Sequence, residues 1–534
     1  MNRLIIYLLF LGSGTTGLIY QVLWTRLLTL TFGVTTLAIS TVLTCFFGGL
    51  ALGSFLGGRW VDKRGEGFKW YGYAEIVIGL YALFFLFFLE INNFLYVRIA
   101  GALDTGFYGL SLLKFILAAL LLIIPTTMMG ATLPILSKTL ARVRASFAKD
   151  VGNLYAINTA GAVAGAVLTA FVLIPSFGIK AVIISVGVIN IAMGVVAVYL
   201  NKTASKEELL GEGADDVRDE EAERVSGDSV PGWFAKLAVI CFALSGFTAL
   251  AYEVVWTRVL GFILTGTIYA FATVLAVFLT GIAAGSFVVS RYIDRLKGGP
   301  GGVINLMALA EVLIGVVSTA LIILYAAMPG FDFYHRITST QNFSEFIYLN
   351  FLVSFILLFI PAFLFGTTFP LVCKIYSRRM DRVGTSIGEV YSINTVGGIL
   401  GSFAGGFLLI QFIGMQKSLV LMGIINVSLG VIFFYFNPFS GRKLKYVSSV
   451  VSASLIIIVI LLLPANMPLS LHESLLRKNE RILYYGEGPA ATVMIAERSG
   501  AGLKFSNKRL WVNGNMATAA FYEGLQINRF QGVL

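Results

Sequence analysis

Charged residues and histidines are scarce in this sequence of 534 residues. Charged side chains make up 13% of it and histidine occurs twice, whereas hydrophobic residues account for 57%. A soluble protein cannot hide that much apolar surface, because its buried volume grows too slowly with chain length. The scarcity of charge therefore excludes a soluble globular protein, and it indicates helices within a lipid bilayer.

Cysteine is scarce as well. Cys45, Cys241 and Cys373 all lie inside apolar runs and share no spacing typical of metal ligands. We interpret them as small apolar packing residues. The two histidines lie in separate polar stretches. The sequence thus predicts neither a metal site nor a cofactor.

Thirteen apolar runs are long enough to cross a hydrocarbon core as helices. Six of them lie near residues 4–24, 35–57, 70–91, 111–136, 152–176 and 180–200. Another six lie near 234–255, 268–290, 304–328, 348–376, 388–412 and 416–436, and the last spans 447–464. These runs predict an all-α polytopic membrane protein whose first partner is the lipid bilayer.

Basic residues gather in alternate loops. They follow the second, fourth, eighth and tenth runs and precede the thirteenth, all on one side if every run crosses. By the positive-inside rule that side is the cytoplasm, which also places the N-terminus there. The net charge of +11 therefore reports membrane orientation, and we predict no nucleic-acid partner. The parity of thirteen runs puts the C-terminal segment outside.

An acidic stretch separates two halves of the chain. Residues 201–232 hold ten Asp and Glu residues and almost no large apolar ones. Such a segment cannot bury enough surface to order itself, so it predicts a flexible linker. The predicted domains are a first six-helix repeat, the linker, a second six-helix repeat, a thirteenth helix and a small soluble β-module, at 1–200, 201–232, 233–437, 438–465 and 466–534.

The strongest signal in the sequence is an internal repeat. Residues 10–62 match 242–294 without a gap, and the match continues to the end of each half at a slightly larger shift. Each half holds six runs, so both enter the membrane in the same sense, as the halves of major-facilitator transporters do. A cavity on the axis between them is the default place for a ligand. Matched positions include Ser13/Ser245, Tyr20/Tyr252, Trp24/Trp256, Glu75/Glu311 and Gly178/Gly414.

Several polar residues inside the apolar runs are candidates for that cavity. Arg26 and Arg258 each lie two residues after a Trp, which is typical of an interfacial anchor and is also compatible with an anion site on the axis. Glu253 has Gln21 as its counterpart, and a lone carboxylate in an apolar run marks a functional site by default.

Two further pairs of polar residues favour structural roles. Asn158 and Asn394 lie beside GxxxG pairs, which favours close helix packing over a ligand site, although both stay cavity candidates. Glu75 and Glu311 are interpreted as residues of the first helical turn, where a carboxylate complements the helix dipole.

Residues 480–513 change character. Short β-prone stretches such as 492–496 and 508–512 alternate with glycine-containing turns. This pattern predicts a small sheet in the C-terminal module.

Several sequence motifs belong together. They are YQVLWTR at 20–26, GxALGSxxGGRWVD at 49–62, NTAGAVAG at 158–165, YEVVWTR at 252–258, NTVGGILG at 394–401, and YYGEGPAATVMI followed by RLWVNG in the module. In these motifs the sequence resembles the bacterial membrane-bound spermidine synthases that are fused to a major-facilitator-like domain. The resemblance implies a platform in the bacterial inner membrane that carries aminopropyl transfer from decarboxylated S-adenosylmethionine to a polyamine.

The parts of that family that perform the chemistry do not occur in this sequence. There is no strand–GxGxG–helix unit for the nucleoside donor before Leu534. Where the family has an acidic pair and a Tyr-His-Glu stretch, only Tyr522 and Glu523 correspond. The sequence therefore predicts no catalytic residues, and it predicts that this polypeptide alone is inactive as a transferase.

Three function classes stay open. The first is the membrane platform of a spermidine-synthase-like protein, completed by a separate catalytic subunit. The second is a major-facilitator-like transporter of a small solute, for which a polyamine is a candidate. The third is a structural subunit that anchors a larger assembly.

Overall fold

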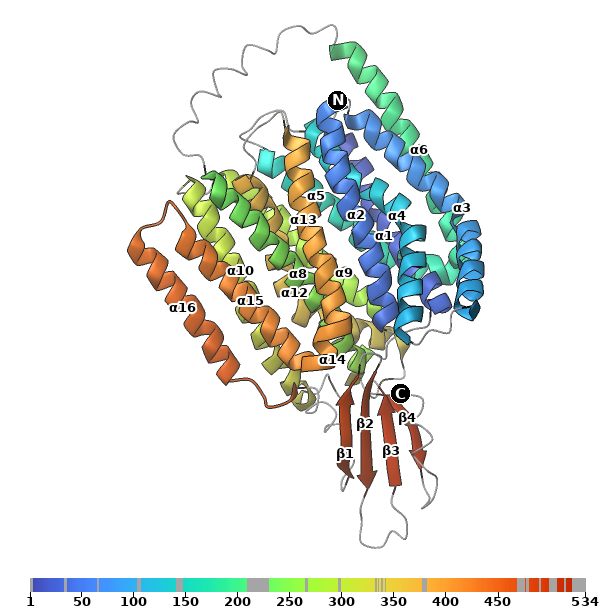
Figure 1. The fold of residues 1–534 in the computed structure, drawn as a ribbon, viewed down its shortest axis with the longest axis vertical. Coiled ribbons are helices and arrows are strands. Elements are labelled where there is room, and N and C mark those ends of the chain that lie inside the picture. The colour runs from blue at the N-terminus through green and yellow to red at the C-terminus, as the bar shows by residue number, and fades with distance from the viewer. Residues whose placement is uncertain are drawn as a thin grey trace.

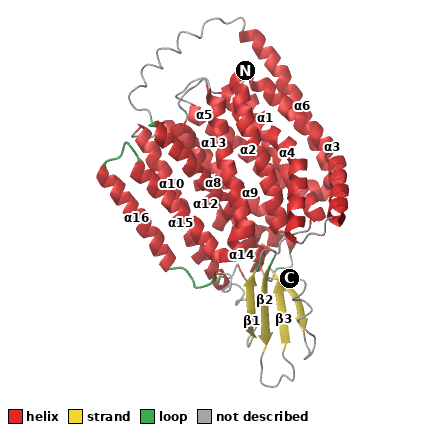
Figure 2. Ribbon diagram, in the orientation of Figure 1, coloured by secondary structure: helices red, strands yellow, loops and turns green. Residues whose placement is uncertain are grey.

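The computed structural model describes residues 3–520, apart from residues 33–35, 65–66, 103–106, 141–146, 209–229, 265–267, 296–298, 377–381, 489–490, 499–506 and 513–514 and positions within 332–341 and 468–479. A bundle of long helices forms the body of the molecule, and a small sheet projects from one end (Figures 1 and 2). We call that end the module side. The opposite end, where the N-terminus lies and α6 ends, is called the linker side (Figure 1).

Each half of the bundle contains six membrane-crossing helical stretches. The first half consists of α1 (Arg3–Phe32), α2 (Thr36–Arg64), α3 (Gly67–Ala102), α4 (Phe107–Leu140), α5 (Phe147–Leu168) continued by the π-helical η2 (Thr169–Leu173), and α6 (Ile174–Glu208). The second half consists of α8 (Gly232–Leu264), α9 (Ile268–Tyr292) with η3 (Ile293–Arg295), α10 (Gly299–Ala327) with η4 (Met328–Gly330), α12 (Phe343–Tyr376), α13 (Val383–Phe403) with η6 (Ala404–Leu409) and α14 (Ile410–Ile413), and α15 (Met415–Phe436).

Two glycines make the chain turn between crossings at equivalent places. One apolar stretch, Lys149–Lys202, has 54 residues, far more than the roughly 20 that one crossing needs. It breaks at Gly178, whose φ is 74°, and the second half breaks in the same way at Gly414, whose φ is 83°. Residues that carry a Cβ atom rarely adopt a backbone conformation with positive φ, so glycine is needed at both turns. The break confirms two separate crossings where the sequence predicts them.

The two halves repeat the same helix packing. In the first half α1 packs on α5, α2 on α4 and α3 on α6, and in the second half α8 packs on α13, α9 on α12 and α10 on α15. The halves meet through α2 with α13 and through α5 with α9, which are again equivalent pairs. The predicted architecture of two parallel six-helix repeats is therefore confirmed.

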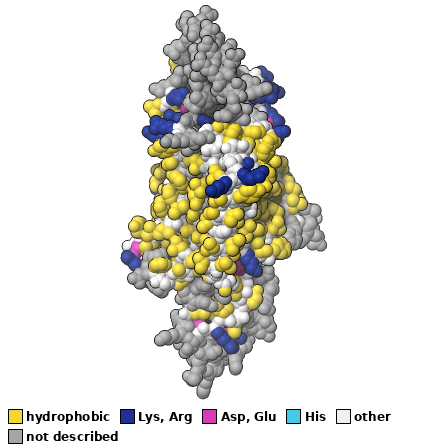
Figure 3. Space-filling model, turned by 90° about the vertical axis from the view of Figure 1, so that its left-hand side faces the viewer, with side chains coloured by type: hydrophobic (Ala, Val, Ile, Leu, Met, Phe, Trp, Pro, Cys, Tyr) yellow, Lys and Arg dark blue, Asp and Glu magenta, His cyan; other side chains and the backbone are white. Residues whose placement is uncertain are grey.

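The outside of the bundle is apolar. On α3, for example, Phe84 and Phe87 are more than half exposed, and Figure 3 shows a belt of hydrophobic side chains between ends where Lys and Arg gather. Such a surface is unfavourable in water and suits lipid acyl chains. The thirteenth helix, α16 (Arg442–Leu461), packs against α15 and α10, and buries only Ser452 and Ile456.

The C-terminal module is a four-stranded antiparallel meander of β1 (Glu480–Glu487), β2 (Thr492–Arg498), β3 (Asn507–Val512) and β4 (Asn515–Ala520). The predicted small sheet is thus present. The predicted start of the linker at 201 is early, since α6 continues to Glu208. Residues 209–229 and the module candidates Tyr522 and Glu523 lie outside the described residues.

Candidate functional site

The two halves are joined at the linker side by a pair of equivalent contacts. The Ser54 hydroxyl on α2 donates to the carbonyl oxygen of Gly388 on α13 at 3.3 Å. The Ser286 hydroxyl on α9 donates to the carbonyl oxygen of Gly152 on α5 at 3.1 Å. A Cβ atom on Gly388 would overlap the Ser54 carbonyl oxygen, and one on Gly152 would overlap the Ser290 hydroxyl. Glycine therefore permits the helices of the two halves to touch here.

A carboxylate of the first half caps a helix of the second half at this junction. Asp62, at the end of α2, accepts hydrogen bonds from the backbone N–H of Gly384 at 3.2 Å and of Thr385 at 2.6 Å. These N–H groups belong to the first turn of α13, which receives no side-chain cap from its own Arg382. The first turn of a helix lacks internal acceptors and attracts negative charge. Lys138 lies 3.2 Å from Asp62 and completes this cap.

Further polar contacts surround the cap. Arg59 of α2 lies 3.4 Å from Glu389 of α13, and the Tyr376 hydroxyl donates to Glu389 at 2.7 Å. The Arg59 pair is largely exposed, so it contributes little free energy by itself. Together with Asp62 it gives this junction opposite charges that would have to separate if the halves moved apart.

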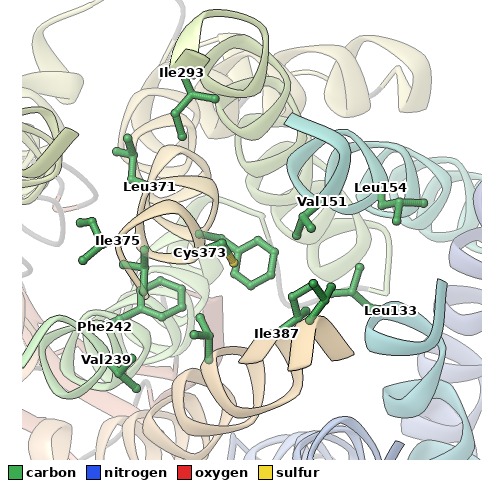
Figure 4. Close-up of a cluster of buried hydrophobic side chains, with 14 of the residues drawn as sticks. Leu133, Val151, Leu154, Val239, Phe242, Ile293, Leu371, Cys373, Ile375 and Ile387 are labelled. Atoms are coloured by element: carbon green, nitrogen blue, oxygen red, sulfur yellow. The ribbon is translucent and has the colours of Figure 1, made fainter. Parts of the chain in front are cut away.

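The buried apolar side chains also join the halves at the linker side and separate them toward the module side. One hydrophobic cluster at the linker side contains residues of both halves, among them Leu133 and Val151 of the first and Phe242, Cys373 and Ile387 of the second (Figure 4). Toward the module side each half has a cluster of its own, built around Trp24 in the first half and Trp256 in the second. A smaller group of Val22, Ala166 and Leu275 also joins α1, α5 and α9.

Gln21 and Glu253 occupy equivalent, buried positions on α1 and α8, where they are 4% and 8% exposed. Gln21 is next to Val22, so this part of α1 lies at the junction of the halves. Among the described residues the Glu253 carboxylate forms no hydrogen bond or ion pair. Burying an unpaired carboxylate lowers the stability of the fold, so a contribution to stability does not explain this residue.

Arg26 and Arg258 have unlike environments although the repeat relates them. Arg26 is exposed on α1. Arg258 is buried and donates to the Gly488 carbonyl oxygen at 2.5 Å and to the Thr492 hydroxyl at 3.5 Å, both between or at the start of strands of the module. Arg258 thus holds the sheet against α8 and does not turn toward Glu253.

A second contact fixes the module to another helix of the same half. The Glu487 carboxylate of β1 accepts from the backbone N–H of Met415, the first residue of α15, at 2.7 Å, and from the Tyr485 hydroxyl at 2.9 Å. Burial, with the adjacent Glu487 charge, raises the pKa of Tyr485 well above its ordinary value. Both anchors, Arg258 and Glu487, attach the module to the second half.

The two asparagines lie in helix contacts. The Asn158 amide donates to the Phe10 carbonyl oxygen on α1 at 3.3 Å, and a Cβ on Gly14 would overlap the Asn158 backbone. Asn394 lies in the same relation to Gly246 of α8. Glycines one turn further along α5 and α13 continue both contacts.

Glu75 belongs to a buried polar network rather than to a first helical turn. The first turn of α3 holds no acidic residue, so the predicted dipole role is wrong. Glu75 is fully buried, accepts from the Ser13 hydroxyl of α1 and from the Asn190 amide of α6 at 2.5 Å each, and Asn190 in turn accepts from Tyr20 at 3.1 Å. The sequence analysis did not single out Asn190. Its match with Asn426 in the repeat is the sequence signal that could have identified it.

The second half carries the same side chains with a different bonding pattern. Glu311 is fully buried and lies beyond the first turn of α10, so the dipole role is wrong here too. Neither of its carboxylate oxygens has a partner within hydrogen-bonding geometry among the described residues, although the Ser245 hydroxyl lies beside it and interacts with it. Asn426 instead accepts from Thr248 at 2.8 Å and donates to the Met422 carbonyl oxygen at 3.0 Å.

Comparison with known proteins identifies the fold. No protein-family model and no curated protein matches the sequence. A bacterial homologue of the iron transporter ferroportin in an outward-facing state aligns with a TM-score of 0.50 at 15% identity, over 85% of this chain and all of the other. The same homologue with soaked iron gives 0.49 at 16% identity over the same shares, and the Major Facilitator Superfamily transporter FucP in the outward conformation gives 0.47 at 13% identity, over 82% of this chain and 98% of its own. The match at a TM-score of 0.50 shows that the helical part of this chain shares the fold of that homologue.

Proposed function

We propose that this protein is a secondary transporter that moves a small cationic solute by rocking its two halves about the axis between them. The observation that carries the proposal is the junction at the linker side. Two equivalent Ser–Gly contacts and the Asp62 cap hold the halves together there, whereas toward the module side each half packs around its own core. Contacts concentrated at one end are what a gate between two rigid halves requires.

The proposed orientation places the linker side in the cytoplasm. The orientation follows from the basic residues of the loops at the linker side of the molecule, and it puts the module outside a bacterial inner membrane. In this orientation the gate at Asp62 is the inner one, and the described arrangement has it closed.

The proposed solute class rests on Glu253. Its carboxylate is buried at the position equivalent to Gln21 and has no basic partner among the described residues, so a cation arriving there would supply the missing charge. Polyamines are the first cations to test, because the sequence resembles proteins of polyamine chemistry.

Uptake by the purified protein in proteoliposomes tests this proposal. We expect saturable uptake of radiolabelled spermidine or of another small amine, and loss of it in Asp62→Asn, which keeps the size of the side chain but removes the charge from the cap. Glu90→Gln, at an exposed position of α3, is the matched control and should transport normally. Absence of uptake across a panel of amines, amino acids and sugars, with the protein correctly folded, would contradict the transporter proposal.

A second candidate is the membrane platform of a spermidine-synthase-like protein. What supports it is the module, which resembles the opening sheet of that enzyme and is fixed to the second half by Arg258 and Glu487. Release of methylthioadenosine from decarboxylated S-adenosylmethionine, upon addition of a co-purifying subunit, would favour this function. Co-purification without turnover or uptake would instead favour a structural subunit.

A further inference from the structure

Two buried glutamates that the repeat makes equivalent, Glu75 and Glu311, differ in their hydrogen bonds. Glu75 receives two hydrogen bonds, from Ser13 and Asn190. Its counterpart Glu311 receives none from the described residues, although Ser245 and Asn426 stand at the equivalent positions. An isolated carboxylate at this depth costs several kcal/mol unless a positive charge accompanies it.

The helix contact explains why the two sites are comparable. Gly79 of α3 packs against Gly187 of α6, and Gly315 of α10 packs against Gly423 of α15. Each glutamate lies one turn before the glycine of its own helix, and each asparagine lies three residues after the partner glycine. The glutamate and the asparagine therefore face the same helix contact in both halves.

The groups around Glu311 suit a small monovalent cation. Ser245 and Cys241 of α8 interact with it, whereas α12, α15 and α16 bring no charged group to it in the described part of the chain. No cluster of three His, Cys, Asp or Glu residues occurs among the described residues, so the ligand set of a divalent metal is not matched. A single carboxylate with neighbouring hydroxyl and amide oxygens balances one positive charge.

We propose that Glu311, with Ser245 and Asn426, forms a binding site for one monovalent cation, H⁺ or Na⁺, buried inside the second half. The first half needs no such ion, because internal donors already satisfy Glu75. The site is separate from Glu253 and from the junction of the halves, so the proposal does not depend on the transported solute.

Thermal unfolding of the purified full-length protein tests the site and identifies the ion. Melts are recorded in choline, K⁺ and Na⁺ chloride, and in each salt from acidic to mildly alkaline pH. A saturable rise of Tm with Na⁺ at fixed pH identifies Na⁺, and a rise with acid that is independent of the salt identifies H⁺. Glu311→Gln should remove whichever response the wild type shows.

Two further variants keep the experiment decisive. Glu75→Gln, the equivalent change in the first half, should retain the wild-type response to ion and pH. Ser245→Ala removes a hydroxyl beside Glu311 that has no partner within hydrogen-bonding geometry in the described part of the chain, so the protein should fold. We expect a roughly tenfold higher half-maximal ion concentration, the effect of about 1.4 kcal/mol. The proposal is overturned if Glu311→Gln and Ser245→Ala respond like the wild type, or if Glu75→Gln loses the response equally.

Discussion

At the scale of single residues, the repeat places identical side chains in unequal surroundings. Ser13 and Asn190 both donate to Glu75, whereas neither carboxylate oxygen of Glu311 has a partner within hydrogen-bonding geometry in the described part of the chain. Likewise Arg26 is exposed while Arg258 is buried under the module. These departures from symmetry are where function is expected, since shared packing needs alone would keep the two copies alike.

Glu253 is the residue whose charge we expect to matter for the solute. Glu253→Gln should not lower the free energy of unfolding in the absence of ligand, because Gln21 fills the equivalent position in the other half and the variant no longer buries an unpaired charge. The rise of Tm caused by spermidine in the wild type should disappear. The measurement is a thermal melt with and without spermidine at several pH values, with Glu90→Gln as control. An identical response of wild type and Glu253→Gln would show that this carboxylate binds no cation.

At the scale of helices, the contact of α2 with α13 determines whether the halves can close at the linker side. The capping of α13 by Asp62 comes from the other half of the chain, so α13 is best stabilised when the halves are together. This couples the end of one helix to the position of the other half.

Gly388→Ala should weaken that contact. A methyl group there would overlap the Ser54 carbonyl oxygen, and we expect a loss of about 1–3 kcal/mol, the usual result of overpacking. Gly17→Ala is the matched control, because a Cβ at Gly17 meets no atom, and it should be neutral or gain up to about 1 kcal/mol of helix propensity. Denaturation of both variants in detergent provides the comparison. Equal stability of the two would show that α2 and α13 do not touch as described.

Arg258→Ala should release the module from α8. The guanidinium donates to Gly488 and Thr492, and loss of a buried charged hydrogen bond typically costs about 1.5–3 kcal/mol. We expect faster cleavage of the module in limited proteolysis, with the helical bundle intact. Arg26→Ala, at the exposed equivalent position, should cleave at the wild-type rate. A module equally protected in both variants would mean that Glu487 alone suffices to hold it.

At the scale of the whole molecule, the described anchors of the module are both on the second half. Both Arg258 and Glu487 bond to helices of that half, so we expect the sheet to move with the second half when the halves rock. Its place at the module side also makes it a marker of membrane orientation.

Labelling of intact cells tests the orientation. A cysteine introduced at Leu483, an exposed position of β1, should react with a membrane-impermeant maleimide, while a cysteine at Glu212 in the linker should react only after the cells are opened. The three native cysteines are buried and should contribute little background. The reverse pattern of labelling would place the N-terminus outside.

Much of the architecture follows from the sequence because its causes are local or periodic. Long apolar runs predict the crossings, matched residues such as Gly178 and Gly414 predict two equivalent halves, and the β-prone stretch at 492–496 predicts a strand. Each of these signals depends on hydropathy or on backbone conformation, which neighbouring residues determine.

Only the tertiary structure decides which polar residues meet. Glu75 lies 115 residues from Asn190 and Asp62 lies 323 from Thr385, and such pairs form through helix packing that no local pattern encodes. For the same reason the sequence suggested a dipole role for Glu75 and Glu311 and could not reveal that one is satisfied and the other is not. Hydrophobicity and repetition thus determine the number, order and symmetry of the helices, whereas the bonding of each buried charge depends on the side chains that neighbouring helices bring to it after packing.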